Sequence, residues 1–186
     1  MTQIYFIRHS ISDLSIKDGL TRPLTNDGIK KVYKLINLFE KIHIDYIFSS
    51  PYKRAILTIE PISVNKNIEI NIVENFREIK ISDNWVNNYN EYIKKWWDDF
   101  SYKLENCESL FETQYRNIQS LEKILIENKD KIIIIGTHGT ALSTIINYYD
   151  NTFLYKEFLN IISIMPYVIR MEFNGIKYIR KEEIKM

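Results

Sequence analysis

The chain has 186 residues, of which 45% are hydrophobic and 26% charged, so its composition is that of a globular domain and not of a disordered segment. Its 25 Lys and Arg residues against 24 Asp and Glu residues leave a formal charge of +1, which argues against a protein that coats nucleic acid or an anionic membrane. One Cys and three His argue against a disulfide framework and a zinc cluster, and we expect no metal and no cofactor.

The N-terminus lacks the basic and apolar regions of a signal peptide, and no apolar run approaches the roughly 18 residues of a membrane-spanning helix. The sequence contains no internal repeat and no Gly/Ser-rich linker. We therefore expect a single domain over residues 1–186, located in the cytoplasm, with no nucleic-acid or membrane partner. The oligomeric state stays open.

The first predicted strand, Gln3 to Ile7, runs directly into Arg8 and His9. Ligands of open α/β sheets bind beyond the carboxyl ends of the strands, so this basic pair is a candidate site. The irregular segment that follows, Ser10 to Pro23, is rich in Ser, Asp and Gly and is typical of an active-site loop or a disordered connection.

The middle of the chain alternates between helix and strand patterns. Thr25 is a plausible N-cap for a helix whose apolar residues recur at helical spacing. A short strand is predicted at Asp45 to Ser50, and the helix that begins after Pro51 carries Arg54 in its first turn. An alternating strand is then predicted over Ile68 to Val73.

The segment from Ser82 to Asn106 carries aromatic residues at the spacing of one helical face. Such a stripe more often packs on a core than stacks on bases, and we interpret it in that way. The segment is also a possible lid or specificity insertion.

Two further signals, a helix start and a strand, follow the aromatic segment. Ser109 predicts the N-cap of a long helix that ends near Asn128. A second apolar strand, Lys131 to Thr137, also ends on a histidine, His138, so two strands present an imidazole at the same end.

The C-terminal region contains Asn174-Gly175, a strong hairpin signal, between apolar runs at Tyr167 to Phe173 and Ile176 to Ile184. The alternation of strands and helices before this hairpin indicates helices on both faces of a sheet. We therefore predict an α/β fold, a three-layer α/β/α sandwich with a mainly parallel sheet and a C-terminal hairpin.

Six segments resemble, in order and approximate spacing, the histidine phosphatase (phosphoglycerate mutase-like) superfamily: Ile7-Arg8-His9-Ser10, Leu24-Thr25-Asn26-Asp27-Gly28, Ser49-Ser50-Pro51-Tyr52-Lys53-Arg54-Ala55, Phe76-Arg77-Glu78-Ile79, Glu108-Ser109 and Thr137-His138-Gly139. The resemblance spans nearly the whole chain. It implies a phosphoglycerate mutase-like fold and a phosphatase that acts on a small phosphorylated substrate without a metal.

The resemblance also implies a role for five catalytic residues. His9 would be the nucleophile that takes the phosphoryl group. Arg8, Arg54 and His138 would bind its oxygens. Glu78 would be the acid that protonates the leaving oxygen.

The chemistry of phosphoryl transfer agrees with those roles. The reaction needs positive charge around the phosphoryl oxygens, and two guanidinium groups supply it. Imidazole is a nucleophile only when neutral, and the neighbouring Arg8 and Arg54 favour the neutral form of His9. An incoming phosphate dianion favours the protonated form of Glu78, which is the form an acid catalyst needs.

The chain departs from the family pattern beside the nucleophile. Ser10 stands where Gly is usual, and Ile11, Ser12 and Ser15 replace the usual Glu-Thr and later Asn of the loop. Because a phosphate ligand is then missing or replaced, Ser10 and Ser15 are candidate substrate ligands. Gly139 is another, at the second strand end.

Several alternatives stay open. Phosphoglycerate mutase-type phosphoryl transfer would use a similar site, although the chain is short for the insertions of such enzymes. A catalytically silent phospholigand-binding or protein-binding module is the third functional class. Asp83 is an alternative acid, Arg77 is interpreted as structural, and the identity of the substrate cannot be derived from the sequence.

Overall fold

The structure is a computed structural model that describes residues 1–81 and 89–185, without the side chains of residues 89–91. The strands are β1 (Thr2–Arg8), β2 (Tyr46–Ser49), β3 (Ile70–Ile72), β4 (Ile132–Thr137), β5 (Tyr167–Asn174) and β6 (Lys177–Ile184). The helices are α1 (Asn26–Phe39), α2 (Lys53–Lys66), the 3-10 helix η1 (Glu74–Phe76), α3 (Tyr89–Asp98), α4 (Leu110–Glu127), α5 (Gly139–Tyr149) and α6 (Tyr155–Ser163). Asp83, the alternative acid, lies outside the described residues.

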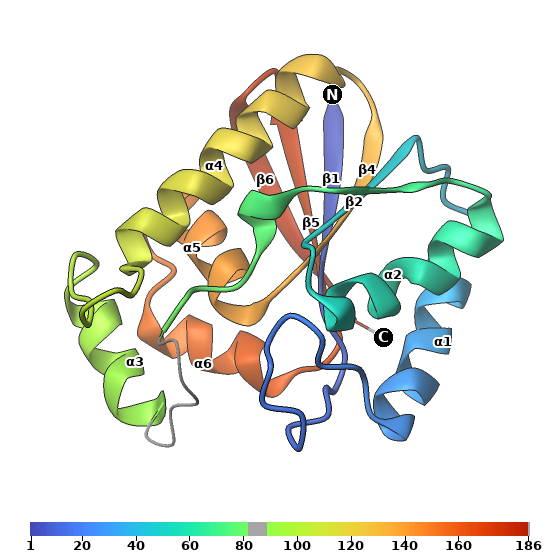
Figure 1. Ribbon diagram of the computed structural model, residues 1–186. Helices are drawn as coiled ribbons and strands as arrows, with labels where there is room; N and C mark the ends of the chain where they lie inside the picture. The colour runs from blue at the N-terminus through green and yellow to red at the C-terminus, as the bar shows by residue number, and fades with distance from the viewer. Residues whose placement is uncertain (82–88, 186) are drawn as a thin grey trace.

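The strands form one sheet in the order β3-β2-β4-β1-β5-β6 (Figure 1). The first four strands are parallel to one another, whereas β5 is antiparallel to both of its neighbours, β1 and β6. In the register of β1 on β4, Arg8 lies opposite Thr137, so the carboxyl ends of the two strands coincide. The mainly parallel sheet and the C-terminal hairpin are confirmed.

Helices cover both faces of the sheet, with α1 and α2 on one side and α4, α5 and α6 on the other (Figure 1). Successive side chains of a strand point to opposite faces, and β1 shows the consequence. Ile4 and Phe6 join the core under α4 and α5, whereas Tyr5 and Ile7 join the core under α1 and α2. Because both faces are covered, the central strands β1 and β4 are buried and largely apolar, and the predicted three layers are confirmed.

Two predicted helix starts are confirmed by their capping bonds. The Thr25 hydroxyl accepts a hydrogen bond from the Gly28 amide at the start of α1. The Ser109 hydroxyl accepts from the Glu112 amide, and the Glu112 carboxylate accepts from the Ser109 amide, which is a capping box.

The described part of the aromatic stripe packs inward. Trp96 and Trp97 are 1% and 8% exposed, and the Trp97 ring contacts Phe100, Phe153 and Phe158. The interpretation of the stripe as core packing is therefore confirmed for these residues. Within residues 1–81 and 89–185, no helix has both the length and the apolar character needed to cross a membrane.

The structure corrects two details of the prediction. Helix α6 was not predicted, and the hairpin turn lies one residue later than expected. Asn174 pairs with Lys177 as the last residue of β5, so the turn consists of Gly175 and Ile176. Gly175 has φ +59°, a left-handed conformation that glycine adopts without strain.

Candidate active site

Two neighbouring parallel strands, β1 and β4, deliver the predicted histidines to the same edge of the sheet. His9 follows β1 and His138 follows β4, and their ring centroids are 5.3 Å apart. The chain leaves β1 toward α1 on one face and leaves β4 toward α5 on the other (Figure 1). In doubly wound sheets, ligands bind in the crevice between two neighbouring strands whose connections leave toward opposite faces of the sheet.

His9 is held in one tautomer by the backbone carbonyl of the next residue, Ser10. Its Nδ1 lies 2.7 Å from the Ser10 carbonyl oxygen, and a carbonyl oxygen only accepts, so Nδ1 carries the proton. Burial, assisted by Arg54 and Arg8, holds the pKa of His9 well below its ordinary value. The ring is therefore neutral at pH 7, and its Nε2 carries a lone pair.

His138 is fully buried and contacts a third strand end. Its Nε2 lies 2.6 Å from the hydroxyl of Ser50, the residue that follows β2. Burial, followed by the charge of Arg54, also holds the pKa of His138 well below its ordinary value. Ser50 had no role assigned from the sequence, although the sequence placed it at the end of a predicted strand.

Arg8 is buried with its guanidinium fixed at the end of α6. Its Nη1 donates to the carbonyl oxygens of Ile161 and Ile164, at 2.8 and 2.9 Å. A Cβ atom on Gly139 would lie 3.1 Å from Arg8 Nε and 3.2 Å from Ile162 Cγ2. Glycine at 139 therefore makes room for the guanidinium beside His138.

Arg54 is 5% exposed and lies at the start of α2, as predicted. Its Nη1 donates to the Gly19 carbonyl oxygen at 2.6 Å, and its guanidinium lies 4.8 Å from the centre of the Tyr52 ring. Burial lowers the pKa of Arg54 to about 10, with smaller contributions from Arg22 and Arg8. The side chain is still a cation at pH 7.

The loop from Ser10 to Pro23 is ordered by polar contacts. Asp18 accepts hydrogen bonds from the Leu20 amide and the Thr21 hydroxyl, and the Leu20 carbonyl accepts from the Lys53 amide. The loop therefore has a defined conformation, and its role as an active-site loop stays a prediction. Arg22, which the sequence analysis did not single out, contributes to the lowered pKa of His9.

The Glu78 carboxylate binds the N-terminus of α5, the helix that follows His138. Its Oε1 accepts from the Ala141 and Ile79 amides, each at 3.0 Å, and its Oε2 accepts from the Thr140 amide at 3.1 Å. A carboxylate has about four lone pairs. The hydrogen bonds found among the described residues therefore leave one lone pair, on Oε2, for a proton.

The two serines that replace family residues lie differently. Ser10 is fully buried, and its hydroxyl donates to the Gly28 carbonyl oxygen at 2.9 Å. Ser15 is on the exposed part of the loop, and its hydroxyl donates to Asp13 at 2.7 Å. The structure thus gathers the five predicted catalytic residues and Gly139, while substrate binding by Ser10 and Ser15 stays a prediction.

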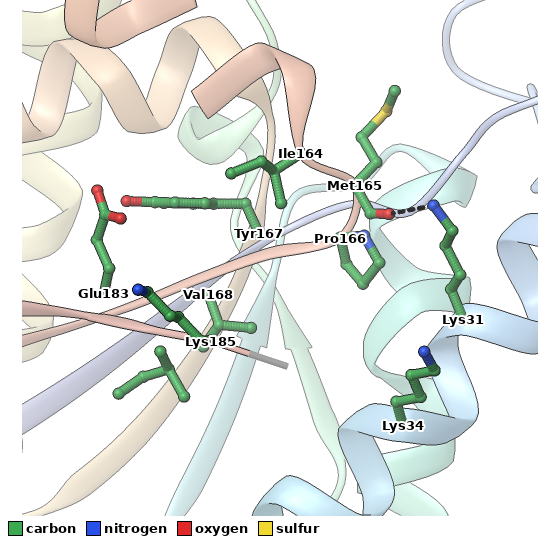
Figure 2. A pocket seen from close by; sticks show the side chains of 10 residues that line it. Lys31, Lys34, Ile164, Met165, Pro166, Tyr167, Val168, Glu183 and Lys185 are labelled. Atoms are coloured by element: carbon green, nitrogen blue, oxygen red, sulfur yellow. Dashed lines mark hydrogen bonds between the residues drawn. The ribbon is translucent and has the colours of Figure 1, made fainter. Parts of the chain in front are cut away.

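A cavity of about 460 Å³ lies between α1 and the end of the hairpin, with Lys31, Lys34 and Lys185 around it (Figure 2). The described residues that line it include none of the five predicted catalytic residues. It adjoins the site through Ile164, whose carbonyl oxygen accepts from Arg8, and through Tyr167, the partner of Arg8 in the β1–β5 register. The cavity is therefore separate from the predicted catalytic residues.

A family model for the histidine phosphatase superfamily, branch 1, matches residues 4–161. The chain belongs to the histidine phosphatase superfamily. Phosphoserine phosphatase 1 of Hydrogenobacter thermophilus is 25% identical to this superfamily member over 154 residues, which are 76% of this chain and 73% of that protein.

Solved structures agree with the superfamily fold. Bacillus stearothermophilus YhfR matches with a TM-score of 0.80 at 22% identity, covering 96% of this chain and 94% of that one. A phosphoserine phosphatase variant from Entamoeba histolytica in complex with phosphoserine gives 0.79 at 19% identity, with coverage of 96% and 94%. The mycobacterial glucosyl-3-phosphoglycerate phosphatase with inorganic phosphate gives 0.75 at 13% identity, with coverage of 98% and 95%. The predicted phosphoglycerate mutase-like fold is thereby confirmed.

Proposed function

We propose that the protein is a phosphatase that hydrolyses a small phosphomonoester through a phosphohistidine on His9, without a metal. The observation that carries the proposal is the hydrogen bond between His9 Nδ1 and the Ser10 carbonyl oxygen. It leaves the Nε2 lone pair as the nucleophile beside Arg8, Arg54 and His138.

In the first step Nε2 of His9 attacks phosphorus, so a P–N bond forms as the bond from phosphorus to the leaving oxygen breaks. Arg8, Arg54 and His138 bind the phosphoryl oxygens. Arg8 Nη1 donates to two backbone carbonyls and Arg54 Nη1 to one, and these bonds orient the planar fork of each guanidinium. Fixed cations of this kind stabilise the charge of the transition state without reorganising.

Glu78 supplies the proton that the leaving oxygen needs. The bound phosphate dianion favours a proton on Oε2, the oxygen that accepts only the Thr140 amide among the described residues. Transfer of this proton releases an alcohol and leaves the carboxylate. In the second step the carboxylate takes a proton from water, the water oxygen attacks phosphorus, and the P–N bond breaks to give inorganic phosphate and neutral His9.

The relatives support a choice of substrate class, since two are named for phosphoserine and one for glucosyl-3-phosphoglycerate. We propose a small phosphorylated metabolite of this kind as the substrate. A specificity role for residues 82–106, and a single domain over residues 1–186, stay predictions.

Phosphate release tests the proposed function. The protein would be incubated with phosphoserine, 3-phosphoglycerate, a sugar phosphate and nitrophenyl phosphate, each with EDTA and with added Mg²⁺. We expect release of inorganic phosphate from at least one metabolite and from nitrophenyl phosphate, at equal rates with EDTA and Mg²⁺.

Three outcomes would contradict the proposal in different ways. Activity only with Mg²⁺ would refute metal independence. Conversion of 3-phosphoglycerate to an isomer without phosphate release would indicate a mutase. Binding of phosphate without turnover of any ester would indicate a silent binding module.

A further inference from the structure

We infer that Arg116, on α4 and behind the site, positions the Glu78 carboxyl by clamping the backbone that carries it. This inference rests on the proposed function of Glu78 as the acid. Arg116 would thus be a positioning residue and not a catalytic one.

The clamp consists of three hydrogen bonds to backbone carbonyl oxygens. Arg116 Nη1 donates to Asn75 at 2.5 Å and to Arg77 at 2.8 Å, and its Nη2 donates to Glu78 at 3.2 Å. The Asn75 carbonyl belongs to η1 and the Arg77 and Glu78 carbonyls directly follow it, in a stretch that lies outside the strands of the sheet. The guanidinium therefore supplies donors that a sheet would otherwise provide.

Glu108 holds the guanidinium in place from the other side. Its carboxylate accepts from Arg116 Nε at 2.8 Å and from Nη2 at 2.9 Å, a bidentate pair. Together with the three carbonyls, this pair uses all five N–H donors of the guanidinium. The Arg116 and Glu108 side chains are only 10% and 15% exposed, so solvent screens their interaction weakly.

The clamp and α5 hold Glu78 from opposite sides. Arg116 fixes its carbonyl, while the amides of Thr140 and Ala141 fix its carboxylate oxygens. A misplacement of about 1 Å can reduce a reaction rate by roughly 10²-fold, so the carboxyl needs both supports to meet the leaving oxygen. The charge of Arg116 also contributes to the lowered pKa of His138, which shows that it lies near the site.

Arg77 provides a matched control. Its Nη2 donates to the same Glu108 carboxylate at 2.7 Å, and its side chain is 27% exposed. Arg77→Gln therefore removes an arginine from the Glu108 ion pair and leaves the three carbonyl bonds of Arg116 in place. Arg116→Lys keeps the positive charge but cannot supply five donors in a planar fork.

The test measures single-turnover phosphoenzyme formation from an alkyl phosphate and from nitrophenyl phosphate, whose leaving group needs little acid catalysis. We expect Arg116→Lys to slow the reaction of the alkyl ester about 10-fold or more and that of the nitrophenyl ester about 3-fold or less. Arg77→Gln should change neither rate more than about 3-fold. The double variant Glu78→Gln/Arg116→Lys should be no slower with the alkyl ester than Glu78→Gln alone, because both changes act through one group.

The outcomes separate the inference from the function on which it rests. Equal losses for both esters in Arg116→Lys, or a double variant whose losses multiply, would overturn the clamp. Glu78→Gln without a selective loss would overturn the acid instead. If Arg116→Lys does not fold, Glu108→Gln, which weakens the other side of the clamp, should show the same selectivity, and equal losses there would overturn the inference.

Discussion

The surroundings of His9 and His138 share some features and differ in others. Both follow buried parallel strands, and in both burial followed by Arg54 is the main cause of a pKa well below the ordinary value. They differ in their hydrogen-bond partners, a carbonyl oxygen for His9 and the Ser50 hydroxyl for His138. A carbonyl fixes the position of the proton, whereas a hydroxyl can donate or accept.

The difference shows that a shared low pKa does not make two histidines equivalent. Only His9 has a hydrogen bond that keeps its Nε2 unprotonated and available as a nucleophile. His138, which can adopt either tautomer beside Ser50, suits the role of a phosphate ligand.

The largest expected effect separates the two rings directly. His9→Ala should abolish turnover and the covalent phosphoenzyme, because it removes the attacking atom. His138→Asn should slow phosphoenzyme formation by roughly 10²- to 10³-fold, the usual cost of losing one group that stabilises the transition state. Rapid-quench experiments with labelled substrate measure both. Turnover by His9→Ala at the normal rate would show that the histidines have been assigned wrongly.

The next effect concerns Arg54 and Arg8, the cations that contribute to the lowered pKa of both histidines. Arg8→Ala and Arg54→Ala should each remove several kcal/mol of transition-state stabilisation, on the order of 10²-fold or more in kcat/KM, because each loses a charged ligand of the phosphoryl group. Lys53→Gln, an exposed neighbour of Arg54, is the control and should retain activity. Comparable losses in the control would mean that net charge, and not the placement of the two arginines, governs the rate.

A smaller and more selective effect is expected at Glu78. Glu78→Gln should slow phosphoenzyme formation from an alkyl phosphate by roughly 10²-fold, the usual scale of general acid catalysis, with much less effect on nitrophenyl phosphate. Single-turnover rates must be compared, because Glu78 also serves the hydrolysis of the phosphoenzyme. If the two esters lose rate equally, Glu78 is structural.

The smallest effect is on the pH dependence of stability. A folded-state pKa below the unfolded value of about 6.5 means that the unfolded chain takes up the proton first as the pH falls. The stability from a buried neutral histidine is therefore complete above about pH 6.5 and is lost below it, by up to about 1.4 kcal/mol per pH unit.

His138→Asn isolates this contribution. Urea unfolding at pH 7 and pH 5.5 should show a weaker loss of the free energy of unfolding in the variant than in the unchanged protein, by about 1 kcal/mol per pH unit. An identical pH dependence in the two proteins would show that folding does not lower the pKa of the buried ring.

Local patterns in the sequence were sufficient for the strands and helix starts that build the site. β1 and β4 are apolar runs that end on polar groups, so their ends and their histidines could be predicted. The caps at Thr25 and Ser109 could also be predicted, because each bond spans only three residues.

Features that depend on distant contacts could not be predicted. Ser50 and His138 are 88 residues apart, and their contact depends on β2 lying beside β4 in the sheet. The Arg116 clamp reaches back about 40 residues from α4. Leu154, the N-cap of α6, has a side chain that cannot accept a hydrogen bond, although its amide donates to the Glu157 carboxylate at 3.0 Å. Phe158 and Ile161 are buried in the core, so α6 depends mainly on packing that the local sequence does not reveal.

The most direct test of the central claim is to locate the phosphoryl group on the enzyme. Protein quenched in alkali during turnover of labelled substrate would be digested, and the labelled peptide identified together with its phosphohistidine isomer. We predict label on Nε2 of His9 that is stable in alkali and released by acid. Label on His138, on Nδ1 of His9, or in an acid-stable ester would contradict the account.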